Sequence, residues 1–230
     1  MSKFLRTGFI AIALTFVLSV LTVSETSAQR TSEALKRMDA HFKALKSLKA
    51  DVKMEKYNKQ VTETDVYTGA IKYVPKSVNG KMYIRIDWEK PVEERMAVVG
   101  NEYLIYRVKQ QQVYAGKTSG AKNNANASNA LAFMSMSRKE LADNFTYRDL
   151  GTETVAGGTQ TIHLELTPKT AANYKMAHLW VDSNGMPVMI RIVENNDDTM
   201  TLLLSNLKKN EKLDGRDFTI DYPKSIKPIR

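Results

Sequence analysis

Between residues 81 and 88 of this 230-residue chain, apolar and polar side chains alternate without interruption. Successive side chains of a β-strand point to opposite faces of its sheet, so this period of two predicts a strand with one apolar and one polar face. The apolar face carries Met82, Ile84, Ile86 and Trp88. A sheet that is apolar on one side must cover that side, and what covers it is the main question that the sequence raises.

Similar segments surround this strand. Residues 67–115 contain three or four successive predicted strands, with turn signals at Asn79-Gly80 and Gly100-Asn101. The other expected strands span residues 52–58, 66–74, 95–99, 102–108, 112–115, 145–150, 161–167, 177–182, 187–194, 199–208 and 218–222. Short strands at this spacing predict an antiparallel meander. Because no internal repeat or linker interrupts it, we expect one domain over residues 29–230.

Helical periodicity occurs near the start of this domain. Residues 32–49 are predicted to form an amphipathic helix with Ser32 as its N-cap. The apolar positions, three or four residues apart, are Leu35, Met38, Phe42, Leu45 and Leu48. A basic amphipathic helix can lie on a membrane, but more commonly it packs its apolar face on a sheet.

A second helical region follows a small, polar segment at residues 116–129, which is expected to form a loop. Residues 130–136 and 137–144 are predicted to be short helices, and Ser137 with Glu140 matches a capping box. This arrangement suits a movable lid over the apolar face, or a crossover helix that plugs it permanently.

The N-terminus has the layout of a secretory signal peptide. Lys3 and Arg6 precede a mostly apolar segment at residues 9–23, and small residues follow at positions 26–28. We therefore expect residues 1–28 to be a signal peptide cleaved after Ala28, and the mature protein to be exported. A retained membrane anchor is the alternative, but the apolar segment is shorter than the roughly 20 residues that a spanning helix needs.

The composition excludes several kinds of chemistry. The chain has no Cys, so it contains no disulfide, thiol nucleophile or thiolate metal ligand. Cleavage would remove two basic residues and one acidic residue, which lowers the net charge from +9 to +8. A basic surface favours anionic partners such as phospholipid headgroups or acidic protein surfaces. No nucleic-acid-binding motif is present, so nucleic acid is not an expected partner.

Catalytic and metal-binding motifs are also missing from the sequence. The three histidines, His41, His163 and His178, show no metal-ligand spacing, although His163 and His178 could share a site if the fold brought them together. No GxSxG or phosphate-binding glycine motif occurs. We therefore expect no enzyme activity, no metal and no cofactor.

Binding by burial of apolar surface is the chemistry that the composition favours. The chain contains eleven methionines, and their flexible, polarizable side chains can repack around an irregular guest. Methionine also fills gaps in ordinary cores, so this observation leaves both interpretations open. Met54 and Met82 lie on expected strands, and Met134 and Met136 lie on the candidate lid.

Several segments, taken in order, resemble the LolA-like family of periplasmic outer-membrane lipoprotein carriers. Trp88 and Pro91 stand where the family has a strand with a Trp that ends near a Pro. The other matching segments are Gly69-Ala70-Ile71, the hairpin at residues 99–106, the LxLxPK strand end at residues 164–169, and the tail from residues 204–207 through Phe218 to Pro223. Each match is weak alone, and the ordered series is fairly specific.

The resemblance implies a mainly β fold with helices: a half-open, curved antiparallel β-barrel whose concave face the helices cover. It also implies a monomeric carrier that binds lipoprotein acyl chains, receives them from an inner-membrane lipoprotein-releasing transporter and passes them to an outer-membrane acceptor. Known carriers have an Arg before the Pro that ends the early strand, where it holds the lid closed. This chain has Val74 before Pro75, and Arg85 alternates to the polar face. The sequence therefore does not identify a residue that would hold the lid closed.

These considerations predict an acyl-binding cavity on the apolar face. The expected lining residues are Met54, Met82, Ile84, Ile86, Trp88, Tyr103, Leu164 and Leu166 from strands, and Leu131, Phe133 and Met134 from the lid. Two other functions remain open. One is an envelope-stress sensor or regulator with the same fold, and the other is a structural envelope protein whose own helices fill the apolar face.

Overall fold

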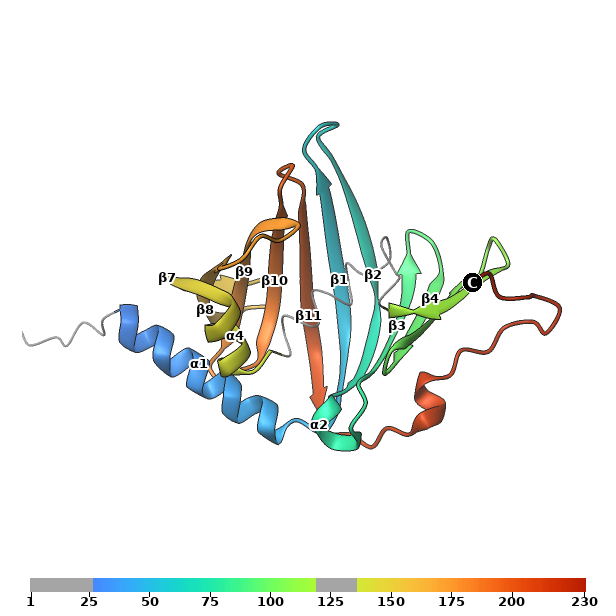
Figure 1. The fold of residues 1–230 in the computed structure, drawn as a ribbon, viewed down its shortest axis with the longest axis horizontal. Helices are drawn as coiled ribbons and strands as arrows, with labels where there is room; N and C mark the ends of the chain where they lie inside the picture. Colours follow the sequence, from blue (N-terminus) through green and yellow to red (C-terminus); the bar gives the residue numbers. More distant parts are fainter. Residues whose placement is uncertain (1–26, 119–135) are drawn as a thin grey trace, which may run out of the picture.

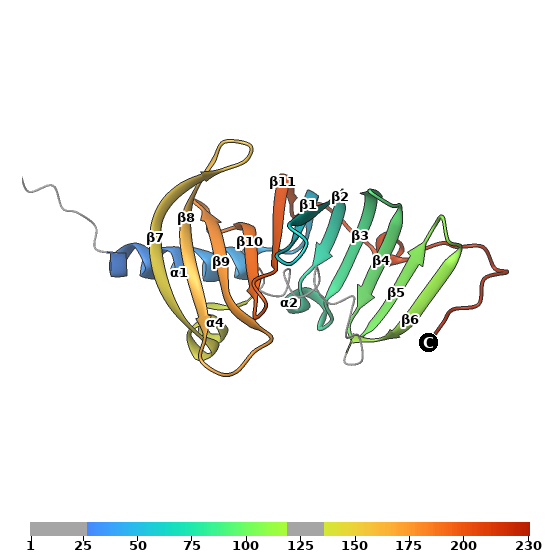
Figure 2. The ribbon, with the colours of Figure 1, turned by 90° about the horizontal axis from the view of Figure 1, so that it is seen from above.

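The computed structural model describes residues 27–118 and 136–230. In these residues eleven strands form one antiparallel sheet, in the order β6-β5-β4-β3-β2-β1-β11-β10-β9-β8-β7. The strands are β1 Leu48–Asn58, β2 Glu63–Val74, β3 Tyr83–Lys90, β4 Glu94–Val99, β5 Glu102–Arg107, β6 Gln112–Lys117, β7 Phe145–Val155, β8 Thr159–Pro168, β9 Tyr174–Asp182, β10 Pro187–Glu194 and β11 Thr199–Lys209. The sheet curves but does not close, because β6 and β7 are its two edges (Figures 1 and 2). The prediction of a mainly β, open, curved barrel is confirmed.

The sheet consists of two meanders joined at one pair of strands. Strands β1 to β6 pair in sequence order, and so do β7 to β11, while β1 pairs with β11 to unite the two halves. Alternating burial along the strands gives the sheet its apolar concave face. Ile84 and Ile86 in β3 are completely buried, and Ile86 pairs with Ile71 of β2 and Met96 of β4.

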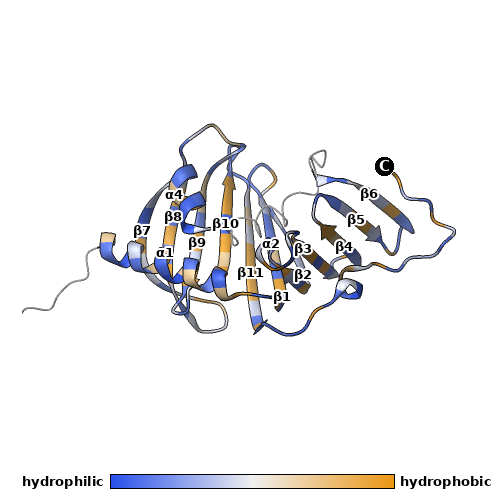
Figure 3. Cartoon of the chain, turned by 60° about the horizontal axis from the view of Figure 1, so that its bottom comes forward, coloured by the Kyte–Doolittle hydropathy of each residue, from blue (hydrophilic) through white to orange (hydrophobic). Residues whose placement is uncertain are grey.

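Helices cover the half of this face formed by the second meander. Helix α1 spans Ser27–Ala44 and contacts β7, β8 and the short helix α4, Arg138–Asn144. Ala34, Leu35 and Met38 of α1 and Leu141 of α4 belong to the main hydrophobic core. Figure 3 shows apolar stripes along β8, β10 and β11, next to α1.

The predicted limits of the first helix were wrong at both ends. The helix already includes Ser27 and ends at Ala44, and Leu48 is the first residue of β1. Leu48 is followed by buried residues at alternate positions, and it pairs with Tyr73 of β2 and Lys209 of β11. Strand pairing on both sides therefore outweighs the helical spacing of Leu48 with the preceding apolar residues.

The predicted last strand, residues 218–222, was also wrong. The chain forms a 3-10 helix at Gly215–Phe218 (η2) and continues as an irregular segment. This segment crosses the convex face of the first meander. There Ile220 packs in a second apolar cluster with Ala97, Tyr106 and Val113. The alternation that suggested a strand thus reflects side-chain packing without backbone pairing.

Among the described residues, no helix has both the length and the apolar character needed to cross a membrane. The segment predicted as signal peptide lies largely outside the described residues. Cleavage after Ala28 therefore remains a prediction.

Candidate functional site

The predicted strand residues of the acyl site all belong to one apolar cluster on the concave side of the sheet. Its buried members include Met54 of β1, three residues of β3 and two of β8, while Met82 and Tyr103 are only partly buried and pack against it. The residues of β3 and β8 are Ile84, Ile86, Trp88, Leu164 and Leu166. The period-two pattern therefore placed them on the same face. Their role in lining an acyl site remains a prediction.

The three predicted lid residues, Leu131, Phe133 and Met134, lie outside the described residues. The helix after them is described, and it starts as predicted. Ser137 is the N-cap of α4: its hydroxyl accepts a hydrogen bond from the Glu140 amide, while the Glu140 carboxylate accepts one from the Ser137 amide at 2.8 Å. This capping box fixes where the chain enters α4.

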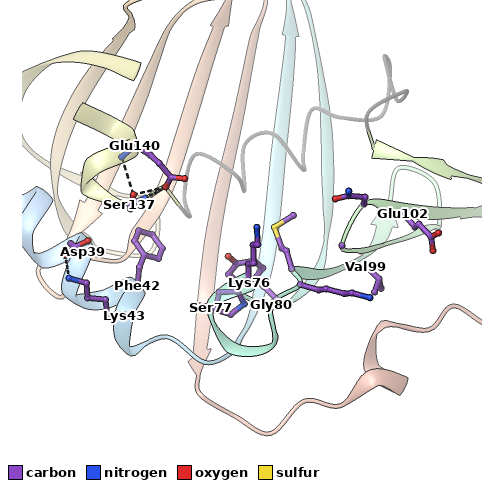
Figure 4. Close-up of a pocket in the computed structure, with 16 residues that line it drawn as sticks. Asp39, Phe42, Lys43, Lys76, Ser77, Gly80, Val99, Glu102, Ser137 and Glu140 are labelled. Carbon is purple, nitrogen blue, oxygen red and sulfur yellow. Dashed lines mark hydrogen bonds and ion pairs between the residues drawn. The ribbon is translucent and has the colours of Figure 1, made fainter. Parts of the chain in front are cut away.

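A cavity of about 1010 Å³ opens at one margin of the concave face (Figure 4). Its walls come from α1, from the short helix α2 (Lys76–Asn79), from the β4–β5 turn and from the N-terminus of α4. Apolar surface is provided by Phe42, Tyr73, Pro75, Met82 and Val99. The remaining lining residues are polar, charged or glycine: Asp39, Lys43, Lys76, Ser77, Gly80, Lys81, Gly100, Asn101, Glu102, Ser137 and Glu140.

Local sequence explains how this cavity is built. Pro75 has an extended backbone and precedes α2, and Gly80 ends α2 with φ at +70°, which glycine adopts without strain. This single helical turn carries Lys76 and Ser77 to the side of the cavity opposite Phe42 and the α4 cap (Figure 4). On α1, the Lys43 ammonium pairs with the Asp39 carboxylate at 2.6 Å.

Of the lining residues predicted on strands, only Met82 lines this cavity. The other predicted strand residues lie in the adjoining packed core. Periodicity identified the apolar face but missed the α2 turn, Phe42 and the α4 cap as walls of the hollow. The turn signal at Pro75–Gly80, with Lys76 inside it and Lys81 directly after it, was visible in the sequence. Its position beside α1 depends on long-range strand pairing.

Arg85 binds partners on the side of the sheet opposite the apolar face. Its guanidinium donates to both Asp87 carboxylate oxygens at 3.0 Å and to the carbonyl oxygen of Thr219 at 2.6 Å. These partners lie on the convex side, where Lys72 also pairs with Asp217 at 2.8 Å. Arg85 therefore holds the C-terminal segment against the outside of the sheet.

The fold does bring His163 and His178 together, on the polar face of β8 and β9. His163 Nε2 lies 3.0 Å from His178 Nδ1, and His163 Nδ1 lies 3.1 Å from a Glu153 carboxylate oxygen. If His163 donates to Glu153, His178 must donate to His163. His163 also stacks on the Trp180 ring, with 4.1 Å between centroids.

Burial shifts the pKa of both histidines of this pair. Desolvation is the main cause that lowers the pKa of both histidines below the usual value, and His163 lowers the pKa of His178 further. The described residues contain no group of three or more His, Asp or Glu side chains suited to a metal ion. His41 lies apart on α1, and burial also lowers its pKa.

Comparison with solved structures shows the same fold in distant proteins. MucB aligns with a TM-score of 0.55 at 14% identity, over 84% of this chain and 63% of that chain. A chain of the Pseudomonas aeruginosa MucA/MucB complex aligns with a TM-score of 0.51 at 16% identity, over 84% of this chain and 61% of that chain. An uncharacterized conserved protein from Thermus thermophilus aligns with a TM-score of 0.55 at 13% identity, over 88% of this chain and 99% of that chain.

This chain thus spans less than two thirds of MucB, and these likenesses show the fold alone. No curated protein sequence matches it. The sequence model of the family described as outer membrane lipoprotein carrier protein LolA, however, matches residues 72–221, more than half of the chain. That match includes the α2 turn and the strands that form much of the concave face. The chain therefore belongs to the LolA family of outer membrane lipoprotein carrier proteins.

Proposed function

We propose that this protein is a periplasmic carrier that binds the acyl chains of lipoproteins and delivers them to the outer membrane. Membership of the LolA family supports this function. The observation that carries it is the cavity of about 1010 Å³ that opens beside a continuous apolar core on the concave face. Ligand pockets in proteins commonly have volumes of roughly 300–1,000 Å³.

Burial of hydrocarbon suffices for such binding, so the proposal needs no reactive group and no enzyme activity. Each buried CH₂ contributes roughly 0.8 kcal/mol, so an acyl chain of about fourteen carbons gains on the order of 10 kcal/mol when most of it is buried. Phe42, Tyr73 and Met82 offer apolar contact at the cavity. A donor transporter in the inner membrane and an acceptor in the outer membrane would supply and receive the cargo.

A substitution at Met82 tests the binding step. Met82→Asp places a carboxylate on the cavity wall, and desolvation of this charge should weaken uptake of a fluorescent acyl probe by about tenfold or more. Val61→Asp is the matched control, because Val61 is 61% exposed in the β1–β2 turn and does not line the cavity. Its uptake should stay within about twofold of the wild type.

Probe fluorescence is measured with circular dichroism as the check of folding. Equal uptake by wild type and a folded Met82→Asp variant would remove the cavity from the binding site. No uptake by the wild type, together with no lipid found by mass spectrometry of the purified protein, would favour the structural envelope protein.

Transfer of a lipoprotein between two membranes distinguishes a carrier from a sensor. MucB is a partner of MucA in a solved complex, and the shared fold keeps a regulatory function open for this chain. A carrier should move a labelled lipoprotein from donor membranes to acceptor membranes in proportion to its concentration. Binding without transfer to the acceptor would favour the sensor.

A further inference from the structure

One margin of the sheet carries five exposed lysines without an ion pair to any described residue. We call Lys46, Lys76, Lys81, Lys208 and Lys212 the basic margin. Lysines 76 and 81 also line the cavity. Two of its five lysines therefore lie where the cavity opens.

Strand register places these lysines at the same end of the sheet. Leu48, the first residue of β1, pairs with Tyr73 near the end of β2 and with Lys209 at the end of β11. The Lys46 amide donates to Asn210 Oδ1 at 2.7 Å, which joins the α1–β1 connector to the segment after β11. In Figure 1, α2 and the end of β11 lie together at the bottom of the molecule.

Three acidic groups near the basic margin form ion pairs, whereas Glu102, which lines the cavity with Lys81, forms none with a described residue. Glu211 pairs with Lys49 at 2.9 Å, Asp217 with Lys72 at 2.8 Å and Asp39 with Lys43 at 2.6 Å. At the opposite end of the strands, in contrast, exposed acids and bases are mixed. Lys175 pairs with Asp197 at 2.6 Å there, and Asp65, Glu63 and Glu89 are further exposed carboxylates.

An exposed apolar side chain stands within this basic surface. Val78 lies on α2 between Lys76 and Lys81, and it is 43% exposed. Lysines attract anionic lipid headgroups, and an apolar side chain among them can enter the headgroup layer.

We propose that the basic margin docks on a membrane containing anionic phospholipids. Docking there would turn the cavity opening toward the lipid surface, which gives acyl chains a short path into the protein. The membrane-binding surface rests on its own charge pattern, while this path rests on the proposed carrier function. An acidic protein surface is the competing partner, and the experiment separates it from the lipid.

Vesicle flotation tests the proposal with two charge-matched triple variants. Lys46→Glu, Lys208→Glu and Lys212→Glu reverse three charges of the basic margin at residues that do not line the cavity. The control variant carries Lys59→Glu, Lys90→Glu and Lys109→Glu. These exposed lysines lie at the other end of the strands. The two variants have the same net charge, so only the position of the change differs.

The wild type should float with vesicles that contain phosphatidylglycerol and stay unbound with phosphatidylcholine alone. The basic-margin variant should lose roughly 100-fold in affinity, and the control should stay within about threefold of the wild type. Equal loss in both variants would show that binding follows net charge and would overturn the docking surface. Absence of wild-type binding to anionic vesicles would overturn it too, and would favour a protein partner.

Uptake of an acyl probe from solution by the wild type is measured in parallel. Vesicle binding without probe uptake would reject the carrier function and leave the docking surface standing. Probe uptake without vesicle binding would reject the docking surface and leave the carrier function standing.

Discussion

Gly185 is the residue where the β9–β10 turn meets helix α1. A Cβ atom at this position would lie 2.3 Å from the carbonyl carbon and oxygen of Arg37, and the backbone has φ at +82°. Both features require glycine. The contact sets how closely α1 approaches the sheet.

Gly185→Ala should therefore lower the free energy of unfolding by about 2–4 kcal/mol, through the steric clash added to backbone strain. Urea unfolding followed by circular dichroism measures this change. Gly158→Ala is the control, because Gly158 has φ at +81° with no atom within 4 Å of the added Cβ. If Gly185→Ala lowered the free energy of unfolding no more than the control does, α1 could shift away from the added Cβ without loss of stability.

The histidine pair predicts how stability depends on pH. Because burial lowers the pKa of His163 and His178 below 6.5, the unfolded chain binds more protons than the folded chain as the pH falls through 6.5. The free energy of unfolding should therefore decrease below about pH 6.5. The facing charges are Glu153 and Arg148 of β7, Glu165 of β8 and Arg191 of β10.

His178→Gln should reduce this pH dependence, since it removes one of the two groups. The measurement compares urea unfolding of wild type and variant at several pH values between roughly 5 and 7.5, a window around the ordinary histidine pKa. The difference between the two proteins cancels contributions from His41 and from the carboxylates. If the free energy of unfolding changed with pH equally in wild type and variant, His178 would not contribute to the pH dependence.

At the scale of elements, the C-terminal segment acts as a strap on the convex face of the first meander. Asp217 and Thr219 are held by Lys72 and Arg85, and Ile220 enters the apolar cluster. Near the end of the chain, Ile229 forms a parallel bridge with Tyr114 and thereby occupies part of the free edge of β6. A covered edge strand is protected from pairing with another chain.

Arg85→Ala should loosen this strap, because it removes a charged hydrogen bond to the Thr219 carbonyl worth roughly 1.5–3 kcal/mol. Hydrogen exchange should become faster at the Ile229 amide, which donates to Val113, and at the Ala115 amide, which donates to Ile229. Arg95→Ala is the control: Arg95 pairs with Glu93. Unchanged exchange in the Arg85 variant would mean that the apolar cluster alone holds the strap.

At the scale of the whole molecule, two features share one end of the sheet. The cavity opens there, and two lysines of the basic margin, Lys76 and Lys81, line it. The β1–β11 pair lies between the two meanders and sets their relative position. A ligand that enters from a membrane would thus meet lysines first and the apolar core next.

The sequence by itself determined most of the strands, their apolar face and the α4 capping box. These depend on local chemistry: a period of two places Ile84 and Ile86 on the same face in any sheet, and Ser137 caps a helix through its own neighbours. Tertiary structure alone decided that Leu48 begins a strand, that Phe218 to Tyr222 pack without pairing, and that α2 stands opposite Phe42. It also brought His163 beside His178 and placed five lysines that form no ion pair with a described residue at one end of the sheet. The physical reason is that strand register and helix docking join residues far apart in sequence, and no local pattern encodes those distances.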